Sequence, residues 1–154
     1  MPKKILDIGF SDYGRSSGNF APKDTTIGLD TELVEVKTPF KQIKGIAEDL
    51  PFEEDTLDRV TSSYTIGAHS DIQDSIDEIL RTLKPRGSAY FTVMVNPKSS
   101  SKDEFNKSRL EKYLKTLPIT HLRVRSKWKV PAGSLGSKDY KEFELVQVSF
   151  RKDI

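Results

Sequence analysis

The feature that most restricts the fold is a series of short apolar runs that each stop at a glycine or an acidic residue. Residues 5–9 (ILDIG) follow two lysines and predict a buried strand that ends in a glycine turn. Residues 25–30 (TTIGLD) predict a second strand that ends at an acid, and residues 33–37 (LVEVK) are a candidate third strand. Between the first two runs, residues 10–24 contain glycine, serine and proline without a helical period and predict a loop.

A helical period first appears in the middle of the chain. Its apolar residues recur three or four positions apart as far as Leu83, and Asp71 can cap the first turn. Pro85 then ends this helix, because proline cannot continue one. A strand is predicted before the helix over residues 57–62, and aromatic and β-branched residues predict a buried strand over residues 88–95.

The last third of the chain changes from a helical to an alternating pattern. A helix is predicted over residues 102–117, with a capping box formed by Ser101 and Glu104. Residues 121–130 alternate strictly and predict a half-buried strand, whereas residues 142–150 are apolar on both faces, as in a strand inside a sheet. This order predicts an α/β three-layer fold that ends in a hairpin, with an antiparallel strand near one edge of the sheet.

Composition and charge exclude several kinds of site. The chain has 154 residues, which fits a single domain over 1–154, and it has no cysteine, so disulfides and thiolate metal sites are excluded. The two histidines argue against a histidine-rich metal site, and no metal is assigned. No apolar run approaches the roughly 20 residues that span a bilayer, and the N-terminal stretch lacks a signal-peptide core, so a cytoplasmic location is expected.

The charge is distributed unevenly. Residues 1–97 carry 11 basic and 16 acidic side chains, whereas residues 98–154 carry 14 basic and 7 acidic ones. The basic excess includes one face of the alternating strand, namely Arg123, Arg125, Lys127 and Lys129. This face either contacts the phosphates of RNA or another acidic partner, or keeps an edge strand from pairing with other chains; the sequence favours the second explanation.

The order and spacing of the acidic segments carry a family resemblance. The series consists of Asp7-Ile8-Gly9, Asp30, AEDLPF at 47–52, LDRV at 57–60 and LKPRG at 83–87. It resembles the class I S-adenosylmethionine-dependent methyltransferases, especially the small type 11 group. The resemblance covers about residues 4–95, and the terminal hairpin suits the last two strands of that family. It implies a Rossmann-like three-layer sandwich whose mostly parallel seven-stranded sheet ends in a C-terminal antiparallel hairpin.

The resemblance implies S-adenosyl-L-methionine as cofactor, bound at the carboxyl ends of the strands. It implies that Asp30 accepts hydrogen bonds from the ribose hydroxyls; the alternative is that Asp7 and Asp30 only cap turns. The cofactor-binding positions that it implies are Asp7, Gly9, Ser11, Asp30, Ala47, Glu48 and Ser62.

The chain departs from the family pattern at several places. Ser11 and Tyr13 stand where the family has glycines, and Ile46 stands where many relatives have an acid or an amide. Residues 15–24 lack the apolar period of the family's first helix. We therefore expect fewer helices in the N-terminal half.

Two functions remain open. The first is methyl transfer to an unidentified acceptor, in which His69 or Tyr64 removes a proton; the alternative for His69 is a structural role. The second is a methyltransferase-like scaffold that has lost catalysis and binds a protein or RNA partner. A homodimer is also expected, because missing helices would leave a surface for another subunit to cover.

Overall fold

The computed structural model describes residues 3–9, 25–32, 40–67, 70–95, 106–130 and 143–154. Several predictions therefore lie outside the described residues. These are the loop at 10–24, the candidate strand at 33–37, and the residues Ser11, Tyr13, His69, Ser101 and Glu104.

The described residues form seven strands and two helices. In chain order they are β1 (Lys4–Ile8), β2 (Thr25–Asp30), β3 (Lys41–Lys44), β4 (Leu57–Ile66), α2 (Ile72–Thr82), β5 (Leu83–Val95), α3 (Lys107–Leu114), β6 (Ile119–Val130) and β7 (Phe143–Lys152).

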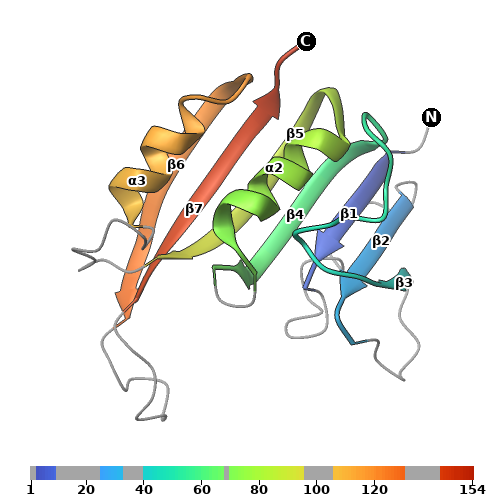
Figure 1. The fold of residues 1–154 in the computed structure, drawn as a ribbon, viewed down its shortest axis with the longest axis horizontal. Helices are drawn as coiled ribbons and strands as arrows, with labels where there is room; N and C mark the ends of the chain where they lie inside the picture. Colours follow the sequence, from blue (N-terminus) through green and yellow to red (C-terminus); the bar gives the residue numbers. More distant parts are fainter. Residues whose placement is uncertain (1–2, 10–24, 33–39, 68–69, 96–105, 131–142) are drawn as a thin grey trace.

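All seven strands belong to one sheet, with the order β3-β2-β1-β4-β5-β7-β6 (Figure 1). The pairs from β3 to β5 are parallel, and β7 lies antiparallel between β5 and β6. This arrangement confirms the predicted Rossmann-like sheet and its C-terminal antiparallel hairpin. It corrects the prediction for β7, whose helix side carries the buried Val146, Val148 and Phe150. The opposite side carries Gln147, Ser149 and Arg151 and is therefore not apolar.

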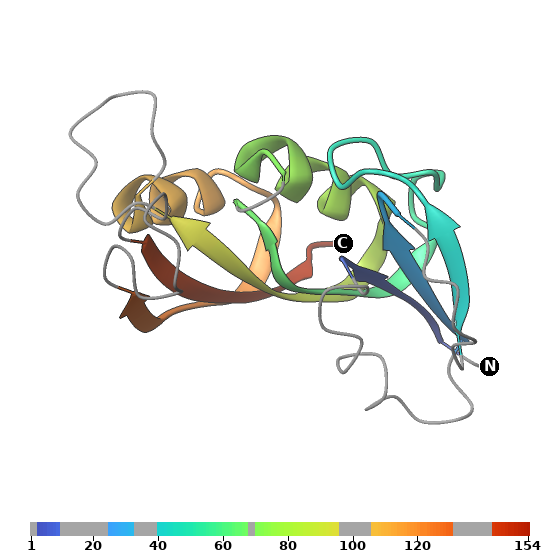
Figure 2. The ribbon, with the colours of Figure 1, turned by 90° about the horizontal axis from the view of Figure 1, so that it is seen from below.

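Both helices lie on the same face of the sheet, together with the segment that connects β3 to β4 (Figure 2). Ile76 and Ile79 of α2 and Leu110 and Leu114 of α3 are fully buried against the apolar residues of the strands. Among the described residues, no helix precedes α2; residues 10–24 and 33–39 lie outside them, so the expected reduction of helices in the N-terminal half stays a prediction.

The helix α2 begins and ends as its local sequence predicts. The carboxylate of Asp71 accepts a hydrogen bond from the backbone amide of Asp74 at 2.9 Å and thereby caps the first turn. At the other end, the backbone amide of Leu83 donates to the carbonyl of Ile79. The chain then continues directly into β5, because Pro85 prevents further helix.

The structure adds one strand and corrects one helix. The added strand is Lys41–Lys44, a short edge strand whose one apolar residue, Ile43, is too weak a signal for a period-2 pattern; the candidate strand at 33–37 stays untested. The second helix is Lys107–Leu114 and not 102–117, because Asn106 has an extended backbone and caps it through a 2.8 Å bond from the amide of Arg109.

Candidate cofactor site

The parallel strands bring their carboxyl ends to one edge of the sheet. Ile8 of β1 is in register with Leu29 of β2 and with Ser62 of β4, and Asp30 is in register with Lys44 of β3. The segments that follow β1, β2 and β3 therefore start side by side. An open parallel sheet binds ligands at this edge, so the structure assembles the region that the sequence predicts.

Gly9 marks the point at which the chain leaves β1. Its φ angle is 76°, in the left-handed region that glycine adopts without a steric penalty. Its backbone amide donates a 2.7 Å hydrogen bond to the carbonyl of Leu29, which ties the turn to β2. A side chain at this position would be strained, so the sharp turn depends on glycine.

Asp7 and Ser62 are buried, and both hold β1 against β4. The Asp7 carboxylate accepts a 2.8 Å hydrogen bond from the hydroxyl of Thr61, and the hydroxyl of Ser62 donates to the carbonyl of Ile8 at 3.0 Å. These bonds give the two residues a structural role at the site's edge. Direct contact with the cofactor stays a prediction for both. Thr61 was missed, because only the register of β1 and β4 places it beside Asp7.

Asp30 is half-buried at the carboxyl end of β2. Its Oδ1 atom accepts hydrogen bonds from the backbone amide of Thr31 at 2.7 Å and from the Thr31 hydroxyl at 3.3 Å. Its backbone carbonyl accepts from the amide of Gly45 at 2.9 Å, which joins the turn after β2 to the turn after β3. The side chain thus has a defined orientation at the ligand edge, and ribose binding by it stays a prediction.

The segment after β3 forms a tight turn at the same edge. A hydrogen bond from the amide of Asp49 to the carbonyl of Ile46 closes this turn at 3.3 Å. Ala47 is buried, whereas the side chain of Ile46 is 47% exposed. The Glu48 carboxylate is half-buried and accepts a long bond, 3.4 Å, from the amide of Asp71 at the start of α2.

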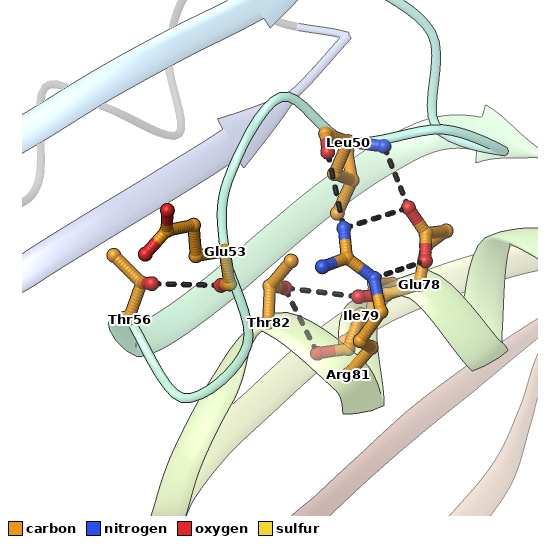
Figure 3. A network of polar contacts seen from close by, with 7 residues as sticks. All are labelled: Leu50, Glu53, Thr56, Glu78, Ile79, Arg81 and Thr82. Atoms are coloured by element: carbon orange, nitrogen blue, oxygen red, sulfur yellow. Dashed lines mark hydrogen bonds and ion pairs between the residues drawn. The ribbon is translucent and has the colours of Figure 1, made fainter.

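Two side chains of α2 hold the far end of this turn (Figure 3). The Glu78 carboxylate accepts the backbone amide of Leu50 at 2.8 Å, and the Arg81 guanidinium donates to the carbonyl of Leu50 at 3.1 Å. Arg81 also donates two bonds to Glu78, at 2.6 and 2.9 Å. We call Leu50, Glu78 and Arg81 the Leu50 clamp. It satisfies both backbone groups of Leu50 and fixes the turn against α2.

The opposite charges of Glu78 and Arg81 stabilise each other. The hydrogen bond from Arg81 lowers the pKa of Glu78 below its ordinary value, although burial opposes this shift. The same bond raises the pKa of the Arg81 guanidinium. The sequence analysis missed the Leu50 clamp. A glutamate and an arginine three positions apart on a helix were the available signal.

We expect the Leu50 clamp to make stability depend on pH at the acidic end of the range. Because the pKa of Glu78 is lowered in the folded state, its contribution is present above the ordinary value of 4.5 and is lost as the pH falls through the folded-state pKa. Glu78→Gln should reduce the free energy of unfolding by about 2 kcal/mol at neutral pH. Urea titrations of both proteins at pH 7 and below pH 4 should show this difference shrinking.

The exposed Glu53 provides the control, because its side chain lies outside the Leu50 clamp. The variant Glu53→Gln should change stability by less than about 0.5 kcal/mol at either pH. A Glu78→Gln effect that is equally large at both pH values would contradict the assigned charge interaction.

The two candidate proton acceptors are only partly placed. Tyr64 lies on β4, four residues beyond Val60, but its side chain is outside the described part, as is His69. Their catalytic roles stay predictions. Within the described ranges, no group of three or more acidic or histidine side chains is arranged to hold a metal ion. No helix in the same ranges has the length and apolar character needed to cross a membrane.

Comparison with known proteins places this geometry in context. A family model described as a methyltransferase domain matches residues 6–91, which is more than half of the chain. The uncharacterized methyltransferase YcgJ of Bacillus subtilis is 33% identical over 114 residues, which cover 66% of this chain and 45% of that protein. The sequence match of this chain therefore spans less than half the length of this curated relative.

Solved structures show the same fold at lower identity. The crystal structure of YcgJ from Bacillus subtilis superposes with a TM-score of 0.74 at 18% identity, covering 99% of this chain and 93% of that chain. Phosphoethanolamine N-methyltransferase 2 of Haemonchus contortus, in complex with S-adenosyl-L-methionine, has a TM-score of 0.74 at 15% identity, covering 100% and 49%. The [4+2]-cyclase SpnF has a TM-score of 0.69 at 15% identity, covering 99% and 75%. The fold thus occurs with more than one named reaction.

Proposed function

Because the chain belongs to the class I S-adenosylmethionine-dependent methyltransferases, we propose that it binds S-adenosyl-L-methionine at the carboxyl edge of β1–β4 and transfers the methyl group to an acceptor. The observation that carries this proposal is the juxtaposition of Gly9, Asp30 and the turn at Ala47, three segments that lie apart in the sequence.

The residues at this edge suit the parts of the cofactor. The left-handed turn at Gly9 lets a ligand approach the backbone closely. The oriented carboxylate of Asp30 suits the two ribose hydroxyls, which donate hydrogen bonds. Buried Ala47, with exposed Ile46 before it, offers an apolar surface and backbone groups for adenine. The Leu50 clamp keeps that turn in position.

Methyl transfer depends more on the positions of the cofactor and the acceptor than on a catalytic side chain. When bound, S-adenosylmethionine supplies a methyl group on a sulfonium sulfur, which departs as a neutral thioether. The protein holds the acceptor in line with that bond, and such positioning supplies most of the acceleration. An acceptor that carries a proton must also lose it, and we assign this proton to Tyr64 or His69.

Calorimetric titration with S-adenosylmethionine and S-adenosylhomocysteine tests the proposal. We expect a dissociation constant in the micromolar range for both, which corresponds to about 8 kcal/mol of binding free energy. Binding accompanied by transfer of a labelled methyl group to a candidate acceptor would establish the enzyme. No binding at millimolar ligand would contradict the cofactor site and favour the scaffold that has lost catalysis.

The family assignment does not identify a binding partner, so the acidic or RNA partner and the homodimer stay proposals. Support for an acidic or RNA partner comes from Arg123 and Arg125 on β6, which are exposed. The side chains of Lys127 and Lys129 lie outside the described part of the chain. The homodimer also stays a proposal, and its support is the expectation that missing helices leave a surface for another subunit to cover.

A further inference from the structure

The face of the sheet opposite α2 and α3 carries an unusual set of side chains. Phe91 and Phe150 are buried in the core on the helix side, so their neighbours Tyr90 and Arg151 lie on the opposite face. The same alternation places Arg59 of β4 there. We define the arginine face by six residues: Arg59, Tyr90, Arg123, Arg125, Ser149 and Arg151.

The strand register places two of the arginines on either side of one strand. Arg59 of β4 is in register with Ser88 of β5, and Ser88 is in register with Arg151 of β7. With strands about 4.8 Å apart, the two arginine backbones are separated by about 10 Å. Tyr90 follows Ser88 by two residues on β5, so its ring lies diagonally between them.

The arginines of β6 extend the same face. Ser149 of β7 pairs with Tyr90 on one side and with Arg123 on the other, and Gln147 pairs with Arg125 in the next row. Tyr90 therefore has an arginine diagonally beside it on β4 and on β7, and two more arginines beyond β7 on β6.

These charges are accessible, and no acidic side chain of the described residues pairs with them. All four arginines are exposed, and Tyr90 is 47% exposed. Among the residues that the structure describes, none of the four guanidinium groups makes a hydrogen bond or an ion pair. None of the residues that pair with Ser88, Tyr90 or Gln147 on the neighbouring strands is acidic. Across the strands from Tyr90, the first acidic residue is Asp7 on β1, because Asp7 pairs with Thr61 of β4. Its carboxylate is buried and accepts a hydrogen bond from the hydroxyl of Thr61.

Protection of an edge strand explains only part of this pattern. That explanation suits Arg123 and Arg125, because β6 is the edge of the sheet. It does not apply to Arg59 and Arg151, since β4 and β7 have paired neighbours on both sides. Nor does it explain an exposed tyrosine on the interior strand β5.

We propose that the arginine face binds single-stranded RNA. Guanidinium groups match phosphates, and an exposed ring on a sheet stacks against an unpaired base. Ser88 lies two residues before Tyr90 on β5, and Ser149 pairs with Tyr90 from β7. The hydroxyls of both serines are placed to form hydrogen bonds with the 2′-hydroxyl of a ribose. The inference rests on the register and the exposures, and it does not require that the cofactor site be active.

Fluorescence anisotropy with a labelled oligouridylate of about 12 nucleotides tests this site. The affinity should fall with added salt at a slope near −3 on a double-logarithmic plot, since each phosphate contact contributes about −0.7. The double variant Arg59→Gln/Arg151→Gln should make that slope shallower by about 1.4. Tyr90→Ala should weaken binding about 5- to 100-fold with an unchanged slope, and Tyr90→Phe should restore it.

Control measurements test whether binding depends on the arginine face and not on positive charge anywhere on the surface. Lys112→Gln removes an exposed charge on α3 and should change affinity less than about twofold. Circular dichroism should show each variant folded, and binding of S-adenosylhomocysteine should be the same in the arginine variants as in the wild type. A wild type that does not bind RNA at low salt overturns the proposal, as does an equal loss in Lys112→Gln. Equal affinity for oligodeoxythymidylate or for phosphatidylserine vesicles also overturns it.

Discussion

Replacing Asp30 with alanine is expected to weaken binding of S-adenosylhomocysteine about 100-fold. A carboxylate at the end of β2 that accepts two hydroxyl donors makes two charge-assisted bonds, each of about 1.5–3 kcal/mol. Since about 1.4 kcal/mol corresponds to a factor of ten, a loss near 3 kcal/mol gives that fold-change. Calorimetric titration of the purified variant provides the measurement.

Glu32 offers a matched control for this experiment. It lies two residues from Asp30, carries the same charge and is exposed. Glu32→Ala should leave the affinity within about twofold of the wild type, because an exposed charge is screened by water and salt. Should Asp30→Ala bind as tightly as the wild type, Asp30 would only cap the turn through Thr31, and the ribose site would lie elsewhere.

Replacing Phe91 with alanine is expected to reduce the free energy of unfolding by about 3–5 kcal/mol. Phe91 is fully buried on β5, and its ring packs edge-on against Phe150, with the ring centroids 5.9 Å apart. The substitution removes apolar contacts and leaves a cavity between the sheet and the helices. Because this loss is a large share of the stability of an ordinary domain, the urea midpoint should fall markedly.

The neighbouring residue on the same strand supplies the control. Tyr90 is 47% exposed on the opposite face, so Tyr90→Ala should cost less than about 1 kcal/mol. Equal destabilisation by the two substitutions would mean that the face opposite the helices is also buried. That outcome would contradict both the placement of the core and the accessibility of the arginine face.

Local signals made several elements predictable. The cap at Asp71 depends on residues within one turn of the helix, so the sequence contains the whole interaction. The glycine at the end of β1 is predictable for the same reason, because the left-handed turn needs that residue type at that point. The resemblance to a methyltransferase domain, expected over about residues 4–95, is confirmed by the match over 6–91.

Other elements lacked such signals. Lys41–Lys44 pairs on one side only, and its single half-buried isoleucine produces no alternation that could separate it from a loop. The start of α3 was predicted wrongly because Ser101 and Asn106 are both good capping residues, and a sequence pattern does not rank them. The binding roles of Asp7, Glu48 and Ser62 also stay predictions.

The sequence by itself determined the order of the described strands and helices other than β3, and the glycine and acid at the strand ends, because each depends on residues near one another in the chain. Only the tertiary structure decided which distant residues meet. Thr61 bonds Asp7 across 54 positions, and the Leu50 clamp joins residues 31 positions apart. The arginine face likewise draws on four strands. Strand order and register create these contacts when the whole sheet assembles, and no local pattern encodes either of them.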